Sequence, residues 1–179
     1  FTKKVSTKKA IDAEIFGQRE TQMRKARFLL VLSIVLSMPL SLMADKWKTR
    51  PLSSIDKQYM AKQIASIDDL ARRNFGRYIT GKKENDIAVM QRLLDDGIVR
   101  SADVKYLQAM GIILGSLLKS ERGLNWTVYI DSLGRSRALQ LPDYKKDFIF
   151  PTTQISRKVE VGNTVKVAEV YETLEQSIT

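Results

Sequence analysis

The chain has 179 residues, a formal net charge of +10, and neither cysteine nor histidine. Without thiol and imidazole side chains, a single chain cannot form disulfides, cysteine nucleophiles, Ser-His-Asp triads or thiolate and imidazole metal sites. The remaining chemistry is that of carboxylates, lysine, serine and tyrosine, and neither a cofactor nor a metal site is expected.

The first quarter of the chain has the pattern of a secretion signal. A basic stretch begins at Met23, an apolar run follows over 28–38, and Pro39 and Ala44 come next. A charged head, a short apolar core and a small-residue exit are typical of a signal peptide. Residues 23–44 are therefore interpreted as a signal peptide cleaved near Ala44, and the protein is expected to be periplasmic or secreted.

An uncleaved signal anchor is the alternative interpretation of the same segment. A stable membrane span needs about 20 mostly apolar residues, whereas 28–44 is shorter and contains three serines and a proline. If it were uncleaved, this stretch would hold the domain at the periplasmic side of the inner membrane and would be its only membrane contact. Residues 1–22 are interpreted as translated upstream sequence or a disordered tail.

Two helices are predicted at the start of the mature chain. Residues 45–52 are expected to form a linker before a single α+β domain over 53–179. Ser53 and Asp56 have the spacing of a capping box, and the apolar positions that follow recur at the helical period. These patterns predict a helix that ends near residue 75 and a second, shorter one over 84–96.

A third helix is predicted over 101–122. Its middle is apolar on nearly all sides, which is typical of a helix that is buried on all sides. Gly111 and Gly115 lie one turn apart and would let another backbone approach closely. The same spacing occurs in membrane helix dimers, but this run is too short to span a membrane, so packing in the core is favoured.

After this helix the apolar period changes from helical to alternating. Alternation over 124–131, the turn before Gly134 and a return segment over 135–141 predict a β-hairpin. A third short strand is expected over 146–150, followed by two short helices. The predicted fold is therefore α+β, with three N-terminal helices, a small three-stranded antiparallel sheet and two C-terminal helices.

Several sequence motifs in the second half occur in a fixed order. They are GLNW at the end of the glycine-containing helix, DSLGRSRALQLP in the hairpin, and FPTTQISRKVEVG before the last helix. With these motifs, the chain resembles the bacterial domain-of-unknown-function family 3806 over about residues 107–174. The resemblance implies a bacterial source and supports the α+β layout, but it implies no activity and no catalytic residues.

The stretch GRYITGKK nearly matches a phosphate-binding loop. Gly76, Gly81 and Lys82 fit the pattern, but Lys83 stands where a Ser or Thr would hold magnesium. The segment before it reads as an amphipathic helix rather than a buried strand. The sequence therefore favours a turn with surface lysines over a nucleotide site.

Basic residues gather around this turn beside two aromatic residues. One interpretation is a site for an anionic polymer or a partner protein. The other is that the cations complement the dipole at a helix C-terminus while the aromatic rings pack inward. The candidate anion-binding or partner-binding residues, called here the basic cluster, are Arg72, Arg73, Arg77, Lys82 and Lys83.

Ser116 and Lys119 match the S-x-x-K pattern of serine enzymes that use a Ser-Lys dyad. The motif is short, no K-T-G follows it, and the helix that carries it reads as central and buried. We treat the pair as the low-priority catalytic candidates of the chain.

The sequence as a whole indicates an exported protein without catalysis. It would bind another envelope protein or an anionic polymer, and nucleic acid is not expected as a partner. The alternatives are a small serine hydrolase that uses Ser116 and Lys119, and a membrane-tethered accessory subunit. The sequence does not define the oligomeric state.

Overall fold

The longest helix among the described residues, α2 (Ser54–Phe75), begins with the capping box that the sequence predicts and ends where it predicts. The computed structural model describes residues 47–141 and 147–178, which belong to one compact unit, Asp45–Thr179. The Ser53 hydroxyl accepts a hydrogen bond from the Asp56 amide (3.2 Å), and the Asp56 carboxylate accepts one from the Ser53 amide (3.1 Å). This reciprocal capping box satisfies two amides at the helix start. Gly76, with φ of 64°, ends the helix.

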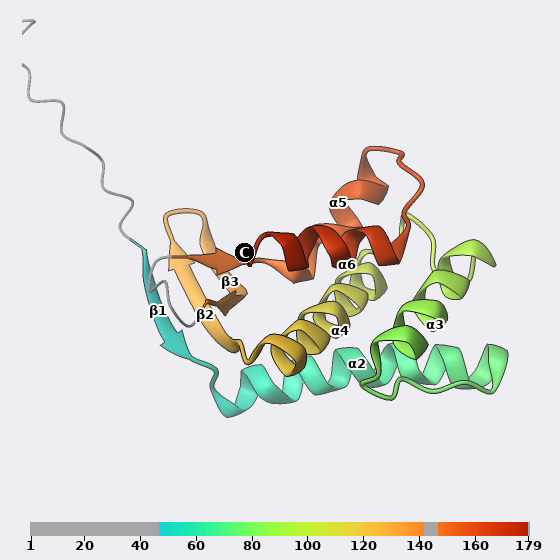
Figure 1. Ribbon diagram of the computed structural model, residues 1–179, viewed down its shortest axis with the longest axis horizontal. Coiled ribbons are helices and arrows are strands. Elements are labelled where there is room, and N and C mark those ends of the chain that lie inside the picture. Colours follow the sequence, from blue (N-terminus) through green and yellow to red (C-terminus); the bar gives the residue numbers. More distant parts are fainter. Residues whose placement is uncertain (1–46, 142–146, 179) are drawn as a thin grey trace, which may run out of the picture. The chain divides into compact units, whose positions relative to one another are not determined.

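The centre of the fold is α4 (Val104–Arg122), as the sequence predicts. Ten of its residues between Leu107 and Leu118 are buried. In Figure 1, α4 lies between α2 on one side and the C-terminal helices on the other. The helix α3 (Lys83–Asp95) packs against both α2 and α4. The buried faces of these helices form one hydrophobic core.

Two glycines in α4 allow the close approach that their spacing suggests. A Cβ atom on Gly111 would lie 2.5 Å from the carbonyl oxygen of Pro151 and 2.6 Å from that of Thr152, and one on Gly115 would collide with the Trp126 ring. Pro151 begins a short 3-10 helix, η1 (Pro151–Thr153), which runs into α5 (Gln154–Glu160). The glycines therefore serve core packing, as expected.

The sheet corrects the predicted layout. It has four antiparallel strands, not three, in the order β1 (Lys48–Pro51), β2 (Asn125–Asp131), β3 (Gly134–Gln140) and β4 (Phe148–Ile149). The prediction that residues 45–52 form a linker and that helices come first is therefore wrong. The class α+β is confirmed.

The pattern of β1 explains why it was not recognised. All four of its residues are exposed, two are basic and the last is proline. An edge strand with charged side chains and a proline gives no alternating apolar signal, and these features also protect the edge from pairing with other chains. Its place in the sheet is set by pairing with β2, where Lys48 lies opposite Ile130 and Pro51 opposite Thr127.

The start of the last helix, α6 (Val167–Gln176), is hydrogen-bonded to the side chain of Gln91 on α3. The Gln91 side chain accepts a hydrogen bond from the Val167 amide (2.8 Å) and donates one to the Val165 carbonyl (3.2 Å). None of the helices in the described part of the chain has the length and apolar character needed to cross a membrane. The predicted signal segment, 23–44, lies outside the described residues.

Candidate functional site

The loop with the sequence GRYITGKK directs its amides to protein carboxylates. The fully buried Asp86 accepts hydrogen bonds from the amides of Thr80 (2.8 Å) and Gly81 (2.9 Å). Asp68 accepts another from the amide of Ile79 (2.7 Å). A phosphate loop needs its amides directed at the phosphate. Here they hold the connection between α2 and α3 in shape, which favours the structural interpretation.

Three of the five residues of the basic cluster lie beside carboxylates. Arg72 and Arg73 each lie 2.6 Å from an oxygen of Asp69. Lys83 is the third of these, since its Nζ lies 3.9 Å from Glu121 and 3.8 Å from Glu175. Its ammonium group therefore faces α4 and α6 rather than its basic neighbours.

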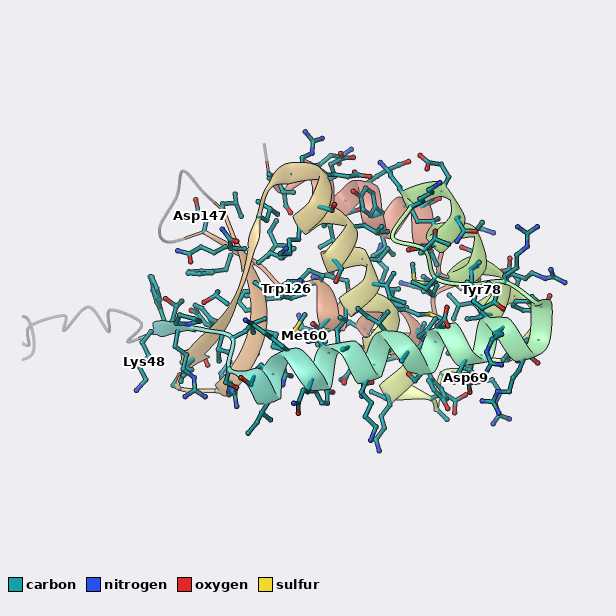
Figure 2. The ribbon with its side chains drawn as sticks, turned by 90° about the horizontal axis from the view of Figure 1, so that it is seen from below. Lys48, Met60, Asp69, Tyr78, Trp126 and Asp147 are labelled. Carbon is teal, nitrogen blue, oxygen red and sulfur yellow. The ribbon has the colours of Figure 1, made fainter. Side chains whose placement is uncertain are left out.

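The other two residues of the basic cluster, Arg77 and Lys82, are exposed and make no ion pair with any residue that the structure describes. Figure 2 shows Tyr78, which follows Arg77 in the chain, near the end of α2 that is farthest from the sheet. The structure thus divides the five predicted residues between local pairing and open surface. Partner binding by them stays a prediction.

Ser116 and Lys119 show no sign of a catalytic pair. The Ser116 hydroxyl donates a hydrogen bond to the carbonyl of Ile112 in its own helix (2.8 Å). Ser116 lines a small cavity of about 320 Å³ together with Asp86, whereas Lys119 is an exposed residue. A Ser-Lys dyad needs the hydroxyl directed at the amine, so this geometry favours a structural role for Ser116.

A larger cavity, of about 590 Å³, lies between the β2–β3 hairpin, α4, α5 and the first turns of α2. We call it the arginine cleft, because three arginines from two separate elements line it. Aromatic, amide and hydroxyl side chains complete its walls. Its lining includes Arg135, Arg137, Arg157, Tyr59, Gln108, Asp131, Leu133, Phe150, Thr152 and Gln154.

The wall formed by β3 is held in place by Asp56. This carboxylate, only 1% exposed, lies 2.6 Å from Nη2 of Arg135 and 3.0 Å from Nη2 of Arg137. The Arg137 guanidinium also stacks 4.2 Å from the centre of the Tyr59 ring. The capping residue of α2 therefore fixes two cationic side chains at the cleft.

The electrostatics of Asp56 favour its ionised form. Burial by itself would raise the pKa of this carboxyl group, but the hydrogen bonds from the hydroxyl and amide of Ser53 and the charges of Arg135 and Arg137 outweigh it. The pKa of Asp56 consequently lies below its ordinary value. The negative charge that holds the arginine pair is thus present at neutral pH.

Other polar groups at the cleft lack an ion-pair or hydrogen-bond partner among the described residues. Arg157 on α5 makes no ion pair with residues 47–141 or 147–178. The Thr152 hydroxyl and the Nε of Arg137 are buried and lack a hydrogen-bond partner among those same residues. Buried donors without partners are rare in native proteins. Both atoms are closed to solvent, so the group that a ligand can reach is the exposed Arg157, and its guanidinium makes the cleft the best candidate site.

Sequence reasoning missed this site, although part of its signal was present. Arg135 and Arg137 stand two residues apart in a strand, which places both on one face of the sheet. Asp56 was identified only as a capping residue. The contact between them joins positions that are 79 and 81 residues apart, and no local pattern reports such a distance.

Carboxylate groups elsewhere do not suggest a metal centre. Within residues 47–141 and 147–178, no group of three or more potential metal ligands is placed to hold an ion. Among the described residues, the arginine cleft has one lining carboxylate, that of Asp131. This carboxylate accepts hydrogen bonds from the amides of Leu133 (2.9 Å) and Gly134 (3.1 Å) in the hairpin turn.

Comparisons with known proteins confirm the family resemblance. Residues 86–171 match the family model described as a domain of unknown function, DUF3806. No curated protein matches the sequence. A crystal structure of a protein from Bacteroides thetaiotaomicron VPI-5482 is similar in fold, with a TM-score of 0.63 and 20% sequence identity over 71% of this chain. The match spans 46% of that protein, so this chain corresponds to less than half of its length.

Proposed function

We propose that this protein is a non-catalytic binding protein that takes an anionic group of its partner into the arginine cleft. The observation that carries the proposal is the convergence of Arg135, Arg137 and Arg157 on one cavity of about 590 Å³. Arginine presents a planar fork of donors that matches carboxylate and phosphate groups. The Ser116 hydroxyl donates its hydrogen bond to the Ile112 carbonyl of its own helix and not to Lys119, which supports binding rather than hydrolysis.

The proposed place of action is the bacterial envelope. The support for this is the pattern of residues 23–44, whose basic head, short apolar core and exit at Ala44 are those of a signal peptide. The partner would be another envelope protein or an anionic polymer. The intact mass of the protein from fractionated cells tests the location, because a mature chain would begin at Asp45.

The binding proposal is tested by following backbone amide signals by NMR while anions are added. Acetate, inorganic phosphate and a galacturonic acid trimer are suitable probes. We expect at least one of them to shift the amides of Gly134, Ser136 and Gln154, and Arg157→Gln to weaken that effect about tenfold, as loss of one charge-assisted hydrogen bond implies.

The matched control is Arg92→Gln. Arg92 is exposed, pairs with Asp96 (3.3 Å) and lies on α3, so the substitution removes the same charge away from the cleft. It should leave the response unchanged. If both variants weaken the response equally, or if neither these anions nor a peptide with one carboxylate acts at the cleft, a specific anion site is refuted.

A further inference from the structure

The net charge of the groups at the arginine cleft indicates the charge of the ligand that would balance it. Arg135 and Arg137 share the carboxylate of Asp56, and Asp131 contributes a second carboxylate to the lining. Three arginines against two carboxylates leave one unbalanced positive charge, which Arg157 supplies. A ligand group with a single negative charge balances it, whereas a phosphate dianion or a polyanion would bring an excess.

The apolar side chains that line the cleft restrict the class of ligand further. Leu133, at the tip of the β2–β3 hairpin, is 94% exposed and lines the cleft, as do the rings of Tyr59 and Phe150. An inorganic anion or a sugar acid would leave these surfaces in contact with water. A peptide carries apolar side chains that gain free energy when they are removed from water against such surfaces.

The neutral polar lining fits a peptide backbone. Gln108 and Gln154 each carry an amide that both donates and accepts hydrogen bonds, and the Gln154 amide nitrogen already donates one to the Phe150 carbonyl (3.3 Å). A peptide bond has the same pairing of one donor and one acceptor. Arginine and tyrosine are also the side chains that are enriched where proteins bind one another most tightly.

We propose that the arginine cleft binds a peptide segment of a partner protein through one carboxylate and one neighbouring apolar side chain. The carboxylate pairs with Arg157 and takes up the remaining donors of Arg135, while the apolar side chain packs against Leu133 and Phe150. This inference rests on the proposed function and specifies the ligand of the same site. The carboxylate comes either from the end of the partner chain or from an aspartate or glutamate side chain within it.

The test is affinity selection on the immobilised protein, read by mass spectrometry. Three pools of random N-acetylated hexapeptides serve as probes, each with one apolar residue. The first has a free terminal carboxylate and no other charge, the second is amidated and contains one glutamate, and the third is amidated and uncharged. The same pools are applied to Arg157→Gln, Leu133→Ser and the control Arg92→Gln.

The proposal expects the first or the second pool to be retained at least tenfold over the third. Retention of the first identifies a chain terminus as the source, and retention of the second identifies an acidic side chain. Arg157→Gln and Leu133→Ser should each reduce the retention about tenfold, while Arg92→Gln should not. Both cleft substitutions replace exposed side chains, so the variants should remain folded, and the dispersion of their NMR signals checks this.

Two results would overturn the inference, and they differ in what they leave standing. If no charged pool exceeds the uncharged one while phosphate or the galacturonic acid trimer shifts the cleft amides, the ligand is not a peptide but the binding function survives. If neither peptides nor the small anions act at the cleft, the proposed function fails together with the inference.

Discussion

Replacement of Gly111 by alanine tests the packing that positions one wall of the arginine cleft. The new Cβ would lie 2.5 Å from the Pro151 carbonyl oxygen and 2.6 Å from that of Thr152. These are backbone atoms, so η1 would have to move away as a unit. Overpacking of this kind costs about 3 kcal/mol at the upper end of its usual range. Alanine regains about 1 kcal/mol through its higher helix propensity, which leaves a net loss of about 2 kcal/mol.

Urea denaturation followed by circular dichroism measures this loss directly. The control is Ser120→Ala, an exposed position in the same helix, which should change the free energy of unfolding by no more than about 0.5 kcal/mol. The amides of Thr153 and Gln154 should shift in Gly111→Ala and not in the control. A Gly111→Ala variant as stable as the wild type, with unshifted amides, would refute the close contact of η1 with α4.

Three further predictions concern the carboxylates and the candidate dyad. Asp56→Asn should lower the free energy of unfolding by about 3 kcal/mol at pH 7, because it leaves two arginines without their buried charged partner. The pKa of Asp56 is lowered in the folded state, so the difference in stability between wild type and variant should shrink as the pH falls below about 4. Urea titrations at several pH values measure this difference. Asp86→Asn should speed hydrogen exchange at the amides of Thr80 and Gly81, with no comparable change in α6. Lys119→Met should leave both the stability and the cellular phenotype unchanged, and loss of function in a folded variant would revive the hydrolase alternative.

Most of the helical part of the fold could be predicted because its signals are local. The capping box before α2, the glycine that ends it and the all-round apolar character of α4 each act within a few residues. The strand β1 could not be predicted, since its position depends on pairing with β2, whose partner residues lie 76 to 82 positions farther along the chain, and all four residues of β1 are exposed. Local sequence patterns predict elements that are stabilised by nearby residues, whereas an edge strand is stabilised mainly by pairing with a distant strand.

The candidate site was hidden for a related reason. The basic cluster is conspicuous in the sequence because its members are close neighbours, yet Arg72 and Arg73 share the carboxylate of Asp69 within the same helix, which offsets one of their two charges. The arginine cleft gathers charges from β3 and α5, which are separated in the sequence by residues 141–153, including β4 and η1. Density of charge along a sequence is therefore a poor guide to the charge that a cavity presents to a ligand.

The contact between Asp56 and the arginines also defines how much of the chain the site requires. The family match over residues 86–171 includes β2, β3 and α5, and therefore all three cleft arginines. It does not include Asp56, which holds two of those arginines, or Tyr59, which stacks on one of them. A fragment confined to the matched residues would leave Arg135 and Arg137 without their carboxylate and β2 without its β1 partner. The unit that forms the cleft accordingly extends at least from β1 to α5, and α2 is as much a part of the site as the hairpin that carries the charges.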